Sequence, residues 1–224
     1  MPPALPDDPV RDLPFAHGGP VLEGMLRLRP EDFVVEEVLG YGPSGAGEHV
    51  WIRLCKRRRN SLEVARALAG LAGVPVSAVG FAGLKDREAL TTQHFSVQLP
   101  GRQEPDWSLL QDADLQLLEV QRHHRKIRRG SLRGNRFRLR ISQVAGDRDL
   151  AEAQLQRIAQ AGAPNYFGEQ RFGRGGENLP RAARLLRGEI RVKGREQRGL
   201  LLSAARSHLF NQVLAARVAG GTWD

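Results

Sequence analysis

The sequence predicts an α+β fold, because segments that alternate apolar and polar residues occur beside segments with helical spacing. At 224 residues, of which 41% are hydrophobic, the chain can bury a proper core as one large domain or two small ones. Strand patterns dominate its first two thirds and helical patterns dominate the rest. We therefore expect a sheet flanked by helices.

Charge and cysteine content narrow the function classes. The chain carries 34 Lys and Arg against 25 Asp and Glu, a net charge of +9, which favours an anionic partner and above all nucleic acid. No apolar run approaches the roughly 20 residues that cross a bilayer, and the N-terminus lacks a signal-peptide layout. Cys55, the single cysteine, excludes an internal disulfide, predicts a buried strand position and favours a reducing, cytoplasmic location.

The first elements are strands. Residues 1–20 are Pro-rich and predicted to be irregular, and strand patterns follow at 21–28, 33–38 and 49–55. The glycine-rich connection 40–47 has phosphate binding as one possible use, but it lacks the Lys-Ser/Thr ending of a P-loop. We expect it to close a hairpin.

A helix follows a basic cluster. Asn60 is the predicted N-cap with Glu63 completing a capping box, and Gly73 and Pro75 end the helix. Its predicted apolar face comprises Leu62, Ala65, Leu68, Ala69 and Ala72. The four cations of 56–59 oppose the helix dipole, so they indicate either a phosphate ligand or a flexible solvated loop.

The stretch 80–95 is the one that the chain is organised around. An apolar approach runs into glycines, a Lys85-Asp86 pair, and then a segment in which alternate apolar residues share one face. Those residues are Phe95, Val97 and Leu99. This predicts a strand, a sharp polar turn and a second strand, with Asp86 as a candidate catalytic residue because rigid strands fix turn geometry. A solvated loop is the alternative.

A strong basic run follows a strand predicted at 115–120. Residues 121–140 hold nine Lys and Arg and no acid, which indicates nucleic-acid contact, with a solvated charged face as the alternative. At its end Phe137, Leu139 and Ile141 are predicted to point in, and Arg136, Arg138 and Arg140 to point out. His123 and His124 should lie on opposite strand faces, which argues against a shared metal site.

The C-terminal part is predicted to be helical. An amphipathic helix is expected at 147–161, and two further helices at about 178–187 and 200–218. Their predicted apolar positions are Leu150, Leu155 and Ile158 in the first helix, and Leu202, Ala205, Leu209 and Val213 in the last. Between them, segment 164–176 interleaves aromatics, glycines and arginines, which is typical either of an RNA-binding surface or of a packed turn with Phe167 and Phe172 buried.

Five stretches in order resemble the TruD family of tRNA pseudouridine synthases. The segment Phe-Ala-Gly-Leu-Lys-Asp-Arg-Glu-Ala-Leu-Thr-Thr-Gln at 81–93 is similar to the family's catalytic motif, and its aspartate falls on Asp86. The other similar stretches are Pro-Glu-Asp-Phe-Val-Val-Glu at 30–36, Arg-Arg-Gly-Ser-Leu-Arg-Gly-Asn-Arg-Phe at 128–137, Asn-Tyr-Phe-Gly-Glu-Gln-Arg-Phe-Gly at 165–173 and Ser-Ala-Ala-Arg-Ser-His-Leu-Phe-Asn at 203–211. The resemblance thus covers nearly the whole chain.

The resemblance implies a mixed, largely antiparallel, pseudouridine-synthase-like sheet flanked by helices. It further implies a catalytic domain at 21–160, incomplete here, and the start of an inserted domain at 161–224, because family members continue well beyond Asp224. The implied substrate is uridine 13 in the D-arm region of tRNA, with no cofactor or metal. We expect a monomer without protein or membrane partners.

Individual residues receive roles from the same resemblance. Asp86 is the implied catalytic carboxylate. The implied substrate-binding residues are Phe33, Asn135, Phe137, Arg27 and Lys85, where Arg27 stands at a position at which the family often has lysine. From the basic run we expect Arg128, Arg129 and Arg133 to contact the RNA backbone. Lys85 and Arg27 are expected to lie near Asp86 as cations that lower its pKa.

Two other functions stay open at this point. A non-catalytic protein could keep the basic RNA face and lack turnover, which the early end of the chain favours. An Asp-dependent nuclease or phosphoryl-transfer protein would need clustered carboxylates for Mg²⁺, and only Glu88 lies near Asp86 in sequence. Pseudouridine formation without magnesium is the measurement that separates the three.

Overall fold

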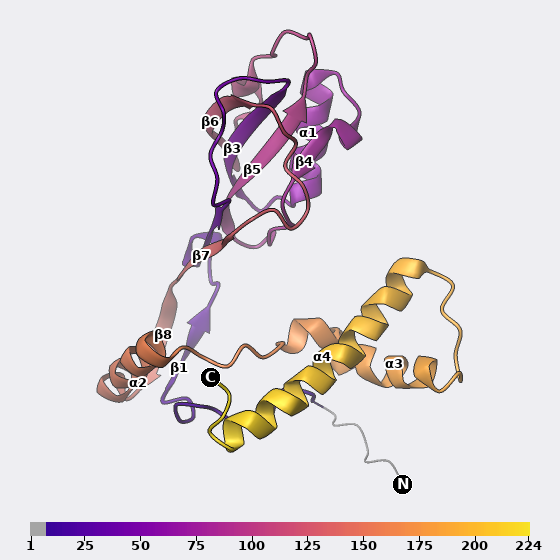
Figure 1. Cartoon of the computed structure of the whole chain (residues 1–224). Helices are drawn as coiled ribbons and strands as arrows, with labels where there is room; N and C mark the ends of the chain where they lie inside the picture. The colour runs from indigo at the N-terminus through magenta and orange to yellow at the C-terminus, as the bar shows by residue number, and fades with distance from the viewer. Residues whose placement is uncertain (1–7) are drawn as a thin grey trace. The chain divides into compact units, whose positions relative to one another are not determined.

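The structure is a computed structural model that describes residues 8–224 (Figure 1). The first seven residues of the predicted irregular segment lie outside the described part, and residues 8–20 contain no helix or strand. The chain divides into two compact units, residues 23–145 and residues 146–224 together with those up to 22. The predicted division into a catalytic and an inserted domain at 160/161 stays a prediction.

The first unit is built mainly from strands and the second from helices. The strands are β1 Leu22–Leu26, β2 Phe33–Val38, β3 His49–Arg57, β4 Val79–Phe81, β5 Leu90–Gln98, β6 Leu115–His123, β7 Gly134–Leu139 and β8 Ile141–Gly146. The helices are α1 Ser61–Ala72, α2 Arg148–Ala161, α3 Asn178–Leu186 and α4 Arg195–Ala219. The predicted α+β class is confirmed, with α1 lying against the sheet of the first unit (Figure 1).

The first unit is built around one six-stranded sheet. Its strand order is β6-β3-β5-β2-β7, with β4 also pairing with β5, and β1 and β8 form a separate two-stranded sheet. Only the β2–β5 pair of the large sheet is parallel, so the predicted mixed, largely antiparallel sheet is confirmed. The hairpin predicted at 40–47 is wrong, because β5 lies between β2 and β3.

Helix α1 begins and ends as its sequence predicts. The Glu63 amide donates to Asn60 Oδ1 at 2.9 Å and the Asn60 amide donates to Glu63 Oε2 at 3.0 Å, which forms the capping box. Gly73 ends the helix with a φ of 61°, in the left-handed region. Leu62 is 41% exposed, so its placement on the apolar face was wrong. Ser61 and Val64 are buried instead, because the face turned to the sheet is rotated by part of a turn.

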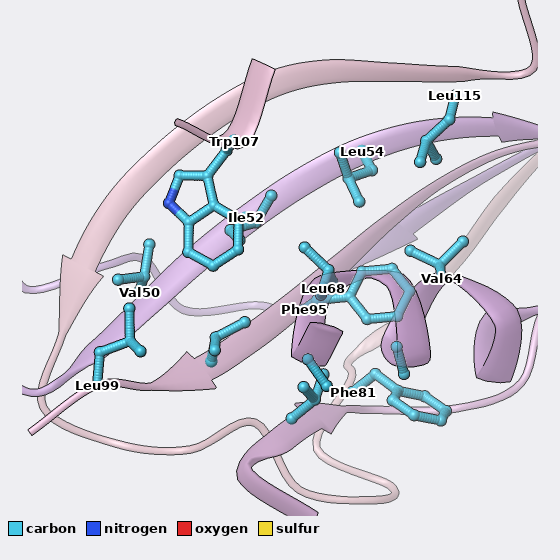
Figure 2. Close-up of a cluster of buried hydrophobic side chains, with 14 residues drawn as sticks. Val50, Ile52, Leu54, Val64, Leu68, Phe81, Phe95, Leu99, Trp107 and Leu115 are labelled. Carbon is cyan, nitrogen blue, oxygen red and sulfur yellow. The ribbon is translucent and has the colours of Figure 1, made fainter. Parts of the chain in front are cut away.

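The main hydrophobic core lies between α1 and one face of the sheet (Figure 2). Val50, Ile52 and Leu54 of β3 alternate into it, and so do Phe95 and Val97 of β5. Phe95, Val97 and Leu99 therefore share one buried face, as predicted, and the strand, turn and strand of 79–98 are confirmed. This core fixes both strands that flank the turn carrying Asp86.

The outer strand β7 differs from its prediction. Register with β2 places Phe137 opposite Val35 and Leu139 opposite Phe33, so the apolar side chains do share a face. However, Phe137 and Leu139 are 57% and 49% exposed, and Ile141 of β8 is also exposed. The expectation that they point into a core was wrong, because the small buried cluster beside them consists of Phe33, Val35 and Ala89 and leaves Phe137 and Leu139 outside it.

In the second unit α3 packs against α4. Phe172 is fully buried, as the packed-turn alternative predicts, whereas Phe167 is half-buried. Asn211 of α4 bonds both main-chain groups of Phe167 at 2.9 Å. RNA binding by residues 164–176 stays a prediction. Leu209 and Val213 of α4 are 64% exposed. The predicted apolar positions of α2, which are Leu150, Leu155 and Ile158, are exposed too, so those faces were predicted wrongly. No helix in residues 8–224 is both long and apolar enough to span a bilayer.

Candidate active site

Buried polar side chains hold the turn between β4 and β5 by hydrogen bonds to its main chain. Gln93 Nε2 donates to the Gly83 carbonyl at 2.6 Å, and the Lys85 amide donates to Ser61 Oγ at 3.0 Å. Ser61 Oγ in turn donates to Gln93 Oε1 at 2.7 Å, which joins the start of α1 to β5. Because Ser61 and Gln93 are fully buried, these bonds are shielded from water and fix the main chain just before Asp86.

A buried ion pair fixes the same turn from β2. Lys85 Nζ lies 2.8 Å from Glu37 Oε2, and the His94 amide donates to Glu37 Oε1 at 3.1 Å. Burial alone raises the pKa of the Glu37 carboxyl, but hydrogen bonds from His94 and Lys85 outweigh it, so this pKa lies below its ordinary value. Lys85 therefore forms its ion pair with Glu37, whereas Asp86 lies beside Arg27. A role for Lys85 as a nearby cation for Asp86 stays a prediction.

Asp86 projects from the turn beside one guanidinium. Its Oδ2 lies 4.0 Å from Nη2 of Arg27, and each side chain is 48% exposed. Arg27 follows β1 and has a φ of 60°, a left-handed conformation that is uncommon and strained for a residue with a side chain. Its guanidinium also lies 4.0 Å from the centre of the Phe33 ring. Arg27 thus links the carboxylate to an aromatic surface.

The predicted base-binding residues lie on this same face of the sheet. Phe137 of β7 stands 6.1 Å from Phe33, ring centre to ring centre, with the planes tilted by 55°. Asn135 pairs with Glu37 in the β2–β7 register, two residues before Phe137, so it presents its side chain to that face as well. Phe33 is buried, whereas Phe137 and Asn135 are exposed. One accessible face therefore combines a carboxylate, a cation, aromatic rings and an amide.

The basic run is partly neutralised by acids from other segments. Within residues 8–224, three of its arginines form ion pairs: Arg122 with Glu104, Arg136 with Glu36 and Arg140 with Asp32. Arg128, Arg129 and Arg133 are exposed and form no ion pair within residues 8–224. The Arg129 guanidinium lies 4.2 Å from the centre of the Phe81 ring. The Gly130 amide donates to the Ala82 carbonyl at 2.7 Å, which ties this part of the run to the strand before the turn.

The basic cluster 56–59 was predicted to mark either a phosphate ligand or a flexible solvated loop. Arg57 pairs with Glu31 and Asp114, and Arg59 pairs with Asp112, so two of its cations are already neutralised. Lys56 is 1% exposed, because β3 continues to Arg57 and Lys56 follows Val50, Ile52 and Leu54 on the buried face. Lys56 and Arg57 thus belong to a strand and not to a loop, while Arg58 is exposed and forms no ion pair within residues 8–224. Phosphate binding by this cluster stays a prediction. Cys55, on the opposite face of β3, is half-buried, and burial raises the pKa of its thiol.

The two adjacent histidines also differ from their prediction. The His123 and His124 rings lie 4.3 Å apart, centre to centre, because β6 ends at His123 and the alternation stops there. Nevertheless, residues 8–224 contain no group of three or more His, Cys, Asp or Glu placed to hold a metal ion. The magnesium-dependent alternative therefore finds no ligand cluster around Asp86 in the described part of the chain.

Sequence reasoning missed the residues that support the turn, which are Glu37, Lys56, Ser61 and Gln93. For Lys56 a signal was present, since the period of two along β3 continues from Leu54 to Lys56. For Glu37 the only signal was an acid at a buried position of a strand pattern. Ser61 and Gln93 gave none, because their pairing joins segments 32 residues apart.

Comparison with known proteins adds an independent finding. Residues 14–191 match a family model described as "tRNA pseudouridine synthase D (TruD)". The chain is 53% identical over 212 residues to a tRNA pseudouridine synthase D of Nitrosococcus oceani, with 93% of the chain and 59% of that protein covered. It is 50% identical over 213 residues to that of Methylococcus capsulatus, with 95% and 60% covered. The chain thus spans about three fifths of the length of these relatives.

A solved structure supports the fold. A putative tRNA pseudouridine synthase D (TruD) from Methanosarcina mazei matches with a TM-score of 0.72 at 21% identity. The match covers 92% of this chain and 63% of that one. At this identity the likeness establishes the fold, and it agrees with the mixed sheet flanked by helices described above.

Proposed function

Because the chain belongs to the TruD family of tRNA pseudouridine synthases, we propose that it isomerises uridine to pseudouridine in tRNA, with Asp86 as the reacting carboxylate. The target that fits this family is uridine 13 in the D-arm region. Residues 21–160 are assigned to the catalytic domain and residues 161–224 to the first part of an inserted domain, in a monomeric protein.

The observation that carries the proposal is a continuous line of contacts on one face of the sheet. Asp86 lies beside Arg27, Arg27 lies on Phe33, and Phe33 lies next to the exposed ring of Phe137. A single side chain, that of Arg27, thus contacts both the proposed reacting carboxylate and the aromatic surface on which a base could stack. Proximity of this kind is the main requirement for a reaction inside a single nucleotide.

The chemistry needs only the groups of this face. Pseudouridine formation breaks the N1–C1′ bond, turns the uracil and joins C5 to C1′, while the C5 proton is lost and N1 gains one. The reaction has no net redox change and takes no group from a second substrate. An ionised carboxylate at Asp86 can act as nucleophile or as base toward the nucleotide. Arg27 supplies positive charge beside it throughout.

The substrate uridine has to leave its stack to reach Asp86. Phe137, exposed beside Phe33, offers a plane for the extruded base, and the Asn135 amide can bond the base edge by donating and accepting. Arg128, Arg129 and Arg133 would hold the flanking phosphates, as exposed arginines of the same unit.

The test is pseudouridine formation on unmodified tRNA, measured with magnesium present and with magnesium removed by chelation. Product under both conditions supports the proposal. Magnesium-dependent cleavage of the RNA would instead support the nuclease alternative.

A second candidate is RNA binding without turnover. It is favoured by the exposed apolar side of β7, where Phe137 and Leu139 are about half accessible, since catalysis requires water to be kept from the reacting base. Tight tRNA binding with no pseudouridine in the same assay would favour this candidate over the first.

A further inference from the structure

Lys56 is a buried lysine in an unusual environment. Its side chain is 1% exposed, and its Nζ donates to the main-chain carbonyl of Arg59 at 2.6 Å and to that of Asp86 at 3.3 Å. Buried lysines are normally paired with a carboxylate, because an isolated buried charge is costly. Within residues 8–224, however, Lys56 forms no ion pair.

The nearby acid on α1 is engaged elsewhere. Glu63 accepts from the Asn60 amide in the capping box at the start of α1. The ammonium group of Lys56 is therefore held by two carbonyls, one just before the N-cap of α1 and one in the turn itself. A charged donor makes hydrogen bonds roughly twice as strong as a neutral one. The ammonium group of Lys56 therefore links the start of α1 to the turn.

We propose that Lys56 is a positioning residue for Asp86, whose buried ammonium group holds the main chain of the turn and so fixes where the carboxylate lies. This rests on the proposed function, in which Asp86 reacts. Gln93 and Ser61 hold the turn before Asp86, whereas Lys56 bonds the carbonyl of Asp86 itself. Without Lys56, that carbonyl would lose its hydrogen-bond donor. The main chain that carries the Asp86 carboxylate would then be less firmly held.

The charge on Lys56 depends on pH in a useful range. Burial lowers the pKa of Lys56 to about 8, with a further lowering from Lys85, while Asp86, Glu63 and Cys55 act in the opposite direction. These are the charged and titratable groups that face it, from the turn, from α1 and from its own strand. Lys56 is thus protonated at neutral pH and loses its proton as the pH rises through about 8. The hold on the turn should weaken over the same range.

The direct test measures the turn and not the reaction. Hydrogen exchange of segment 83–88 is compared in wild type, Lys56→Met and Arg102→Met. Arg102 is a matched control, because this exposed cation donates to the main-chain carbonyl of Gly73 at 2.9 Å, at the other end of α1. We expect exchange in the turn, including the Lys85 amide, to be about 10-fold faster or more in Lys56→Met and unchanged in Arg102→Met.

Kinetics on tRNA give the functional readout. In Lys56→Met, kcat should fall by about 10-fold to 100-fold, the loss expected when a reacting group moves by about 1 Å, with KM changed by less than about 3-fold. Wild type and Arg102→Met should lose activity as the pH rises through about 8, and Lys56→Met should not show that decline. A purely structural role would leave the shape of the pH profile unchanged.

Each outcome decides between the ideas. A folded Lys56→Met with unchanged exchange at 83–88 overturns the proposal. If that variant does not fold, exchange of the wild type is measured at about pH 7 and pH 9. The proposal is overturned if exchange in the turn increases between these pH values by no more than the intrinsic exchange rate does. If wild type shows no pseudouridine formation, the proposed function fails alone, and the exchange data still decide the role of Lys56.

Discussion

The Arg27 guanidinium contacts both the Asp86 carboxylate and the Phe33 ring: its Nη2 lies 4.0 Å from Asp86 Oδ2, and its Cζ lies 4.0 Å from the centre of the ring. Both charged side chains are about half exposed, so this ion pair adds at most about 1 kcal/mol to stability. We therefore expect the Arg27–Asp86 pair to matter for the reaction and to contribute little to the stability of the fold.

Asp86→Asn should abolish turnover and leave tRNA affinity within a few-fold of wild type. The amide keeps the size of the side chain but can act neither as nucleophile nor as base, a loss that typically lowers turnover by about 100-fold or more. Single-turnover pseudouridine formation and a tRNA binding titration measure the two effects. Glu88→Gln is the control, because Glu88 is an exposed acid on the same turn. Residual turnover above about 1% would contradict the assignment of Asp86.

Arg27→Gly should lower turnover by about 10-fold or more without destabilising the fold. Glycine loses the guanidinium beside Asp86 but relieves the left-handed backbone at φ 60°, which costs other residues on the order of 1 kcal/mol. Arg27→Lys keeps the charge and should retain most of the activity. Urea unfolding and turnover are measured on both variants. Full activity of Arg27→Gly would show that this cation does not act on the carboxylate.

Changing Arg128, Arg129 and Arg133 together to Ala should weaken RNA binding of any sequence. If each arginine contacts a phosphate, the slope of log K against log salt should fall by about one per contact. The control pair Arg66→Ala and Arg102→Ala alters charge on exposed residues away from this segment. An unchanged salt slope in the triple variant would return the segment to a solvated charged face.

Glu37→Gln should destabilise the fold by about 3 to 5 kcal/mol, because it leaves the buried Lys85 without its partner. Replacing both residues by Met should recover part of this loss. Since the pKa of Glu37 is lowered by folding, its contribution is complete above pH 4.5 and is lost as the pH falls through the lower folded value. Urea unfolding at several pH values measures the difference between wild type and variant. A difference that persists at the lowest pH would contradict the ion-pair explanation.

Local patterns predicted local structure well. Strand β2 occupies the predicted residues 33–38, and α1 has the predicted capping box, because alternation and caps depend on neighbours in sequence. The hairpin at 40–47 failed because a glycine-rich connection does not specify which strand its successor joins. That choice depends on long-range pairing with β5.

The candidate site was predicted in part. The pattern and the family resemblance pointed to Asp86, Arg27, Phe33 and Phe137, which the structure brings to one face. Lys85 was expected to act as a cation near Asp86, yet its ion-pair partner is Glu37 of β2, 48 residues away in sequence. Long-range pairs of this kind have no signature in a single sequence.

The parallel pairing of β2 with β5 decides where this chemistry can occur. Phe33 begins β2 and the Asp86 turn leads into Leu90 at the start of β5, so both lie at the same end of adjacent strands. With the opposite strand direction, a six-residue strand at about 3.3 Å per residue would separate them by roughly 20 Å, far beyond the reach of one nucleotide. Parallel neighbours require a crossover, and here it comprises β3, α1 and β4. The ring and the carboxylate therefore meet only after that whole crossover has folded, which makes formation of the site a late, non-local event in folding.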